Sequence, residues 1–209
     1  MTAPASIRRW SSLAVPPVHA AELTSTPLKA GSLEQALSAI SQCDLDGAAF
    51  LLVRLGRAEG VDLQRAITAA NASRIGTRVC LAVDLSTLEH VEMDSLVAER
   101  VGLVLDDVDA DTPLSSLMYE SLEAIRFRPE FVARAVRSLR LGCALEAMLA
   151  LAENLGLCTL GPAKAANEGT LAPEPMFDFV PSPLREESNL SKHLAQLDVG
   201  AVQSMRVSR

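Results

Sequence analysis

The sequence contains few of the residues that form metal centres, disulfide frameworks or basic surfaces. Its 209 residues include three histidines and four cysteines. The cysteines are widely spaced and form no Cys-x-x-Cys pair, at Cys43, Cys80, Cys143 and Cys158. This spacing excludes the common zinc and disulfide patterns and indicates buried thiols in a reducing cytoplasm. The net charge of -7 at pH 7 disfavours a nucleic-acid partner, because surfaces that bind phosphate backbones are basic.

Long apolar runs are also absent. Charged or turn residues interrupt every apolar run well short of the roughly 20 residues that a membrane-spanning helix needs, so no membrane span is expected. The segment Ile7-Arg8-Arg9-Trp10 contains the paired arginines of an export signal, but the stretch behind it is short and contains Pro16 and Pro17. We therefore expect no export signal and predict a cytoplasmic protein.

Aromatic residues are scarce although the chain is rich in apolar ones. They make up 3% of the sequence, against 49% for all hydrophobic residues, and the mean hydropathy is +0.22. A chain of this length can form one domain with a sizeable core. The apolar surplus is therefore assigned to that core, with a partner interface as the alternative.

Short apolar runs alternate with amphipathic segments from residue 48 onward. The runs predict strands near 48–54, 78–84, 101–106, 123–127 and 157–160. The amphipathic segments predict helices near 61–73, 130–137 and 142–155, and a further helix that carries Leu33, Leu37 and Ile40 on one face. Short buried strands between such helices are typical of a parallel sheet covered by helices, so the sequence predicts an α/β fold.

The composition also predicts where the domain begins and ends. Residues 1–30 contain four prolines and are predicted to form an irregular N-terminal arm. Residues 31–197 form the domain, which includes a loop over 162–176 and a last helix near 184–196. Residues 198–209 are predicted to be a polar C-terminal tail.

One predicted strand, over 101–106, ends in two adjacent carboxylates, Asp106 and Asp107. In a parallel barrel the carboxyl ends of the strands line the active-site mouth, so this pair is a candidate metal or acid/base position. The alternative is a structural role, because Asp is common in turns and at helix N-caps. Asp109 and Asp111 continue an alternate spacing that also occurs in calcium loops, but the required Gly and Glu are missing. An acidic turn, or an N-cap before a helix starting at Pro113, is expected instead.

Five segments in a fixed order resemble the C-terminal half of the EAL domain, the cyclic-di-GMP (c-di-GMP) phosphodiesterase module. In that family DDFGTG is followed by SSLxYL, LKIDRSFV, a helix ending LAxxLGL, and QGYxFxxP. The corresponding segments here are Asp106-Asp107, SSLMY at 115–119, IRFRPEFV at 125–132, LGL at 155–157 and FDFVPSPL at 177–184. The resemblance covers roughly residues 48–184. Because the family domain is usually longer, it implies a shortened or incomplete (β/α) TIM-like barrel of EAL type.

The resemblance assigns five residues to a vestigial site, which are Arg54, Asp84, Asp106, Asp107 and Arg126. Arg54 falls at the family's metal-ligand Asn, and a guanidinium cannot bind a cation. Asp84 falls at the Glu of the ELTE segment, and Arg126 falls at the family's Lys, where it keeps the charge but loses a titratable amine. These residues are predicted ligand contacts and not catalytic residues.

Other positions depart further from the family pattern. Pro162 stands where AEGVE supplies a carboxylate, Met176 falls near the Gln of QGY, and Arg128 replaces an Asp. The eponymous Glu-Ala-Leu is missing. A two-metal hydrolase needs several oxygen ligands, so the sequence predicts no metal, no cofactor, no catalytic residue and no enzyme activity.

The resemblance then implies a catalytically inactive EAL-like domain that acts as a protein-interaction regulator in bacterial signalling, in motility, adhesion or cell-cycle control. Its expected partner is another protein, and homodimerisation stays open. The alternative is a non-hydrolysing c-di-GMP sensor in which Arg126 and Arg54 face the phosphates. Carboxylates within residues 106–111 oppose such a ligand, because without metals they would repel its two negative charges.

Overall fold

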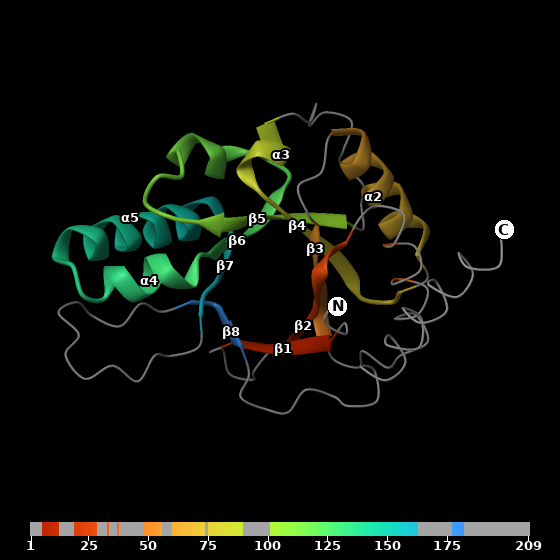
Figure 1. Ribbon diagram of the computed structural model, residues 1–209, viewed down its shortest axis with the longest axis horizontal. Helices are drawn as coiled ribbons and strands as arrows, with labels where there is room; N and C mark the ends of the chain where they lie inside the picture. Colours follow the sequence, from red (N-terminus) through yellow and green to blue (C-terminus); the bar gives the residue numbers. More distant parts are fainter. Residues whose placement is uncertain are drawn as a thin grey trace, which may run out of the picture.

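The computed structural model describes residues 6–12, 19–28, 48–55, 60–73, 75–89, 101–162 and 177–181, together with Leu33 and Leu37 in a helical segment. The described strands are β1 (Ser6–Ser12), β2 (His19–Leu28), β3 (Ala48–Leu55), β4 (Arg78–Val83), β5 (Val101–Val108), β6 (Leu122–Phe127), β7 (Cys158–Leu160) and β8 (Phe179–Pro181). The described helices are α2 (Gly60–Ala72), α3 (Leu85–Glu89), α4 (Pro129–Ala135), α5 (Leu139–Leu155) and the 3-10 helix η2 (Leu114–Met118). Figure 1 shows their arrangement.

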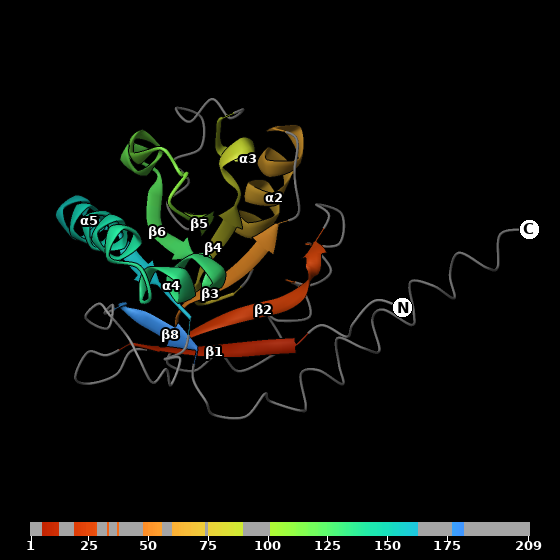
Figure 2. The same cartoon turned by 60° about the vertical axis from the view of Figure 1, so that its left-hand side comes forward.

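Strands β3 to β7 form a parallel sheet of five strands in sequence order. On one side β2 pairs parallel to β3 and antiparallel to β1. On the other side β8 pairs parallel to β7 and antiparallel to β1, so the strand order runs from β1 to β8 and returns to β1. Helices α2 to α5 lie on the outer side of the five parallel strands (Figures 1 and 2). The predicted α/β fold with parallel strands under helices is confirmed.

The link between β5 and β6 is short. In a regular (β/α) barrel an α-helix follows each strand. Between β5 and β6 the chain forms the five-residue 3-10 helix η2 instead. The SSLMY segment lies in this helix and at its C-cap, Tyr119.

The prediction of an irregular N-terminal arm is wrong, because residues 6–12 and 19–28 form β1 and β2. Pro27 lies inside β2, where a proline normally removes a hydrogen bond of the sheet. Here it lies beyond Thr24, the last residue of β2 that pairs with β1, and within a register shift between β2 and β3. The missing N–H is therefore tolerated. The predicted helix near 184–196, the tail over 198–209, Ile40 and Met176 lie outside the described residues.

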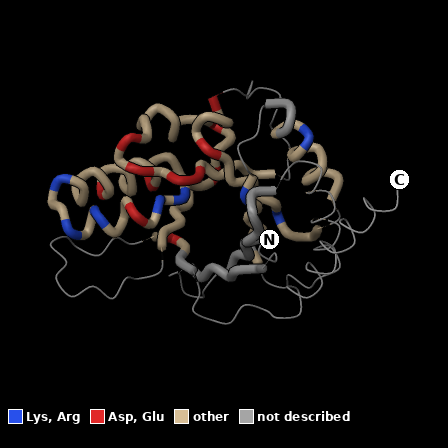
Figure 3. Tube along the Cα trace, viewed as in Figure 1, with Lys and Arg blue, Asp and Glu red and all other residues tan. Residues whose placement is uncertain are grey.

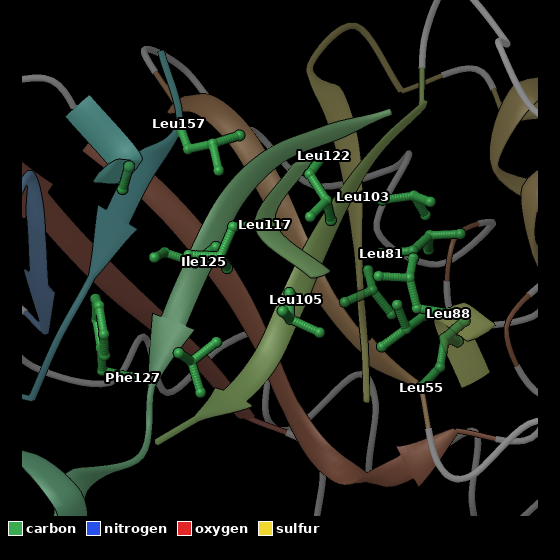
Figure 4. Close-up of a cluster of buried hydrophobic side chains, with 14 of the residues drawn as sticks. Leu55, Leu81, Leu88, Leu103, Leu105, Leu117, Leu122, Ile125, Phe127 and Leu157 are labelled. Atoms are coloured by element: carbon green, nitrogen blue, oxygen red, sulfur yellow. The ribbon is translucent and has the colours of Figure 1, made fainter. Parts of the chain in front are cut away.

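The five parallel strands are apolar on both faces. Leu51, Leu81 and Leu105 point outward to the helices and belong to the main core, part of which is drawn in Figure 4. Leu52 and Val104 belong to a smaller cluster inside the barrel, together with Cys80, Ala82, Ala124, Leu160 and Phe179. A strand buried on both faces needs continuous apolar residues, which explains why these segments read as unbroken runs in the sequence.

A bulge in β6 directs the Glu123 carboxylate into the barrel, at the end opposite the carboxyl ends of the parallel strands. Leu122 pairs with Leu103 and Ala124 pairs with Val104, so Glu123 is an extra residue between them. Gly102 on β5 leaves the space, because a Cβ there would collide with Glu123 Oε2. Arg78 Nε donates to the same Oε2 at 2.8 Å, and Cys80 Sγ lies 3.8 Å from it. Burial, followed by this carboxylate, raises the pKa of Cys80 to about 12.

The expectation that the cysteines are buried holds for Cys80 and fails for Cys143. Cys80 lies inside the barrel, whereas Cys143 is exposed on α5. The buried side of α5 consists of Gly142, Leu145, Met148 and Ala152, and Cys143 follows Gly142 around the helix to the solvent side. Cys158 is half-buried, and burial raises its pKa.

We expect a maleimide to label Cys143 much faster than Cys80 in folded protein of a Cys43→Ser background. The thiolate is the reactive form, and with a pKa of about 12 the buried Cys80 thiol is protonated over ionised by on the order of a thousandfold at pH 9. The raised folded-state pKa of Cys80 also makes the free energy of unfolding depend on pH. The neutral Cys80 thiol contributes fully to this free energy below pH 9, and the contribution disappears as the pH rises toward 12.

Peptide mass spectrometry after timed labelling measures the two rates, and urea-unfolded protein is the control in which both thiols react alike. Equal labelling of Cys80 and Cys143 in the folded chain would show that the interior of the barrel is open to the reagent.

Candidate functional site

The carboxyl ends of β3, β4, β5 and β6 bring the predicted site residues together. Arg54 is the penultimate residue of β3, Asp84 directly follows β4, and Asp106 and Arg126 lie near the ends of β5 and β6. The predicted placement of these residues on neighbouring strand ends is confirmed. Their role in ligand binding stays a prediction.

The Asp106 carboxylate lies between two guanidinium groups. Arg126 donates from Nε to Oδ1 at 2.5 Å and from Nη2 to Oδ2 at 2.6 Å. Arg54 donates from Nε to Oδ2 at 2.9 Å, across the intervening strand β4. The Asp106 side chain is 7% exposed and that of Arg126 is 11% exposed, whereas Arg54 is 40% exposed. Charge-assisted, bidentate bonds of this kind are among the strongest that side chains form.

A second bulge, at the end of β5, separates the two adjacent carboxylates. Leu105 pairs with Ile125 and Val108 pairs with Phe127, which leaves one extra residue on β5. Asp107 has φ of 56°, in the left-handed region, and its N–H donates to Asp106 Oδ1 at 2.8 Å. Asp106 therefore faces the interior, while the Asp107 side chain is 46% exposed and lies 3.7 Å from Arg54 Nη2.

Asp84 has a structural role at the start of α3. Its Oδ1 accepts from the backbone N–H of Thr87 at 2.8 Å and from Ser86 Oγ at 2.9 Å. These bonds satisfy the first turn of α3, as an N-cap residue does. The carboxylate that the resemblance places in a metal site is thus directed to the start of a helix.

The loop after β5 is an acidic turn closed by its own hydrogen bonds. Asp109 Oδ1 accepts from the Asp111 N–H at 3.0 Å, and Asp109 Oδ2 accepts from Arg128 Nη1 at 2.7 Å. The expected helix N-cap before Pro113 is not formed: Pro113 itself is the N-cap of η2, without a side-chain cap bond. The structure contains the acidic turn, which was the other prediction for this segment.

Each of the three mouth arginines therefore faces a carboxylate: Arg54 and Arg126 face Asp106, and Arg128 faces Asp109. Figure 3 shows acidic and basic segments side by side in this part of the barrel. Within the described ranges no group of three or more His, Cys, Asp or Glu side chains could hold a metal ion. Pro162, two residues after β7, offers no ligating side chain.

Solved EAL domains share this arrangement of strands and helices. The EAL domain of FimX from Pseudomonas aeruginosa, determined with bound c-di-GMP, matches with a TM-score of 0.62 and 11% identity over 86% of this chain and 87% of that one. The EAL domain of DcpA from Mycobacterium smegmatis matches with a TM-score of 0.60 and 17% identity over 91% of this chain and 96% of that one. The chain has the EAL-domain fold.

The EAL fold is also found in part of a longer protein, BlrP1 from Klebsiella pneumoniae, in a manganese and c-di-GMP complex. The TM-score is 0.63 at 14% identity, over 88% of this chain and 56% of that one, so the chain spans about half of BlrP1. The sequence matches no family model and no curated protein. At these identities the likeness establishes the fold alone. No helix in the described part of the chain is long and apolar enough to cross a bilayer.

We expect Asp106→Ala to lower the free energy of unfolding by about 3–5 kcal/mol, because it leaves the buried guanidinium of Arg126 without its carboxylate. Asp111→Ala in the exposed turn is the matched control, with an expected change within about 0.5 kcal/mol. Urea unfolding measures both. Equal stability of the two variants would show that the Asp106 ion pairs do not stabilise the fold.

Proposed function

We propose that this chain is a catalytically inactive EAL-type domain that regulates another protein by contact, in bacterial signalling such as the control of motility, adhesion or the cell cycle. The observation that carries the proposal is the pairing of Asp106 with Arg54 and Arg126. These two fixed cations pair with the Asp106 carboxylate at the mouth of the barrel, where the resemblance places metal ligands.

Charge and coordination both argue against metal-dependent hydrolysis. A cation at Asp106 would have to displace three charge-assisted hydrogen bonds from two arginines. It would then find few further oxygen ligands, because Asp84 caps α3 and Pro162 has no donor atom. Two-metal hydrolysis needs both ions to be held in place to activate the water and stabilise the leaving oxygen.

We expect no hydrolysis of c-di-GMP by the purified full chain with Mg²⁺ or Mn²⁺, measured by chromatography of the products. An active EAL phosphodiesterase assayed in parallel verifies the conditions. Metal-dependent turnover that is lost in the isosteric Asp106→Asn variant would contradict the proposal, because it would assign a catalytic role to Asp106.

The second candidate is a non-hydrolysing c-di-GMP sensor, a role that fits the ligand in the FimX structure. It is favoured by Arg54 and Arg128, whose side chains are 40% and 46% exposed at the mouth. Against it, Arg54 and Arg126 are already engaged by Asp106, and Asp107, which is 46% exposed, lies nearby. A ligand with two phosphates would have to compete with these carboxylates for the same guanidinium groups.

We expect isothermal titration calorimetry in metal-free buffer to show no binding of c-di-GMP at ligand concentrations near a millimolar. If the arginines instead form a phosphate clamp, binding appears and weakens by on the order of 1–3 kcal/mol in Arg126→Ala. Arg65→Ala, in an exposed part of α2, is the control that leaves such a clamp intact. Micromolar affinity without divalent ions would move the protein to the sensor class.

A further inference from the structure

Three exposed arginines gather at the turn between α4 and α5, outside the mouth of the barrel. Arg134, Arg137 and Arg140 lie within seven residues, and the stretch 131–145 contains no Asp or Glu. None of the three forms an ion pair with another residue of the described ranges. Figure 3 shows basic segments at this end of the two helices, at the left edge of the molecule.

An exposed apolar side chain lies among these cations. Leu139, the first residue of α5, is 70% exposed. It lies next to Arg140 at the start of α5, away from the buried side formed by Gly142, Leu145, Met148 and Ala152. We name Arg134, Arg137, Leu139 and Arg140 together the arginine corner. Arginine is one of the residues enriched at protein interfaces and at their hot spots.

The arginine corner differs from the basic side chains at the two ends of the barrel. Arg54, Arg78, Arg126 and Arg128 are each paired with a carboxylate of the same chain. Arg65 on α2 is exposed and forms no ion pair with a described residue, but it is a single cation. In a chain with a net charge of -7, three neighbouring exposed arginines form a local basic surface, in which Glu130, one helical turn before Arg134, is the acidic residue of α4. That surface complements an acidic partner.

We propose that the arginine corner is the docking surface for an acidic segment of a partner protein, whose carboxylates pair with the arginines while Leu139 enters an apolar contact. The proposal rests on the proposed function, since it locates the protein contact by which the domain would act. Guanidinium groups recognise carboxylates in a bidentate geometry, and arginine carries this role better than lysine.

Charge and size favour a protein over a polyanion or a membrane. Proteins that bind nucleic acids place a basic surface on the phosphates, commonly with several more cations than three, and this chain is acidic overall. Stable attachment to an anionic membrane takes more basic residues or a second apolar anchor. A protein segment needs only a few carboxylates and one apolar contact, which matches the corner.

The exposed thiol of Cys143 lies one helical turn from Leu139 and Arg140, so it allows the docking surface to be cross-linked. The full chain, with Cys43→Ser, is labelled at Cys143 with a photoactivatable maleimide and irradiated in a lysate of its source organism. Mass spectrometry then identifies the cross-linked peptide. We expect an acidic segment of another protein, captured by the parent and lost in the triple variant Arg134→Glu, Arg137→Glu, Arg140→Glu.

The decisive measurement uses a synthetic peptide of the cross-linked segment. We expect the triple variant to bind it at least about 100-fold more weakly, as for the loss of several interfacial charge pairs, and Arg65→Glu to bind it like the parent. A peptide with its acidic residues changed to lysine should recover binding to the triple variant. Circular dichroism checks that the variants are folded, which is expected because the substituted side chains are exposed.

Three results would overturn the proposal. The captured peptide could bind the triple variant as well as the parent, the cross-link could join two copies of the chain, or the captured material could be nuclease-sensitive. The same photoactivatable label at Arg65→Cys in a Cys143→Ser background tests the arginine corner and the proposed function separately. Capture from α2 but not from α5 contradicts the arginine corner and supports the proposed function, whereas no protein captured from either position contradicts both.

Discussion

The pairing of the Asp106 carboxylate with two arginines determines the arrangement of the barrel mouth. Asp106 is buried, so its charge has to be balanced inside the protein. Arg126 supplies that balance from the neighbouring strand β6, and Arg54 supplies it from β3, across β4. The three side chains tie β3, β5 and β6 together at the end of the barrel where an EAL fold presents its site. Because the bonds use both oxygens of the carboxylate, a cation at Asp106 would have to compete with the two arginines.

This pairing depends in turn on a bulge at the other end of β6. The extra residue at Glu123 shifts the register of β6 by one, so that Ala124 faces Val104 inside the barrel and Arg126 follows on the same face, beside Asp106. A strand without the bulge would turn Arg126 outward and Ile125 inward, because a one-residue slip exchanges the two faces. Gly102 on β5 leaves room for the Glu123 carboxylate beside the bulge. The bulge at one end of β6 thus places the cation at the other end of the same strand.

The parts of this structure that follow local patterns could be predicted from the sequence, and the parts that follow long-range pairing could not. The five parallel strands and the helices α2, α4 and α5 appear where the apolar periodicity predicts them, and the ordered motifs place Asp106 and Arg126 on neighbouring strands. The sequence prediction missed β1 and β2 because the prolines within residues 1–30 indicate irregular structure. Pro27 lies inside β2, where the strand pairing tolerates the missing N–H. The bulges, and the reach of Arg54 across β4, depend on registers that no local pattern encodes.

A single substitution at the mouth would still leave a metal ion in competition with an arginine for Asp106. Arg54 and Arg126 are fixed to the barrel, so they meet Asp106 at an effective concentration set by the fold, whereas a free ion must come from solution and shed water. Removing Arg54 leaves both bonds from Arg126 in place, and removing Arg126 leaves a barrel in which Pro162 still offers no ligand. We infer that the three departures from the family pattern, at Arg54, Arg126 and Pro162, reinforce one another. Among the residues that the structure describes, exposed arginines without an ion pair lie on α2 and around the turn between α4 and α5, where a partner would meet no internal competitor.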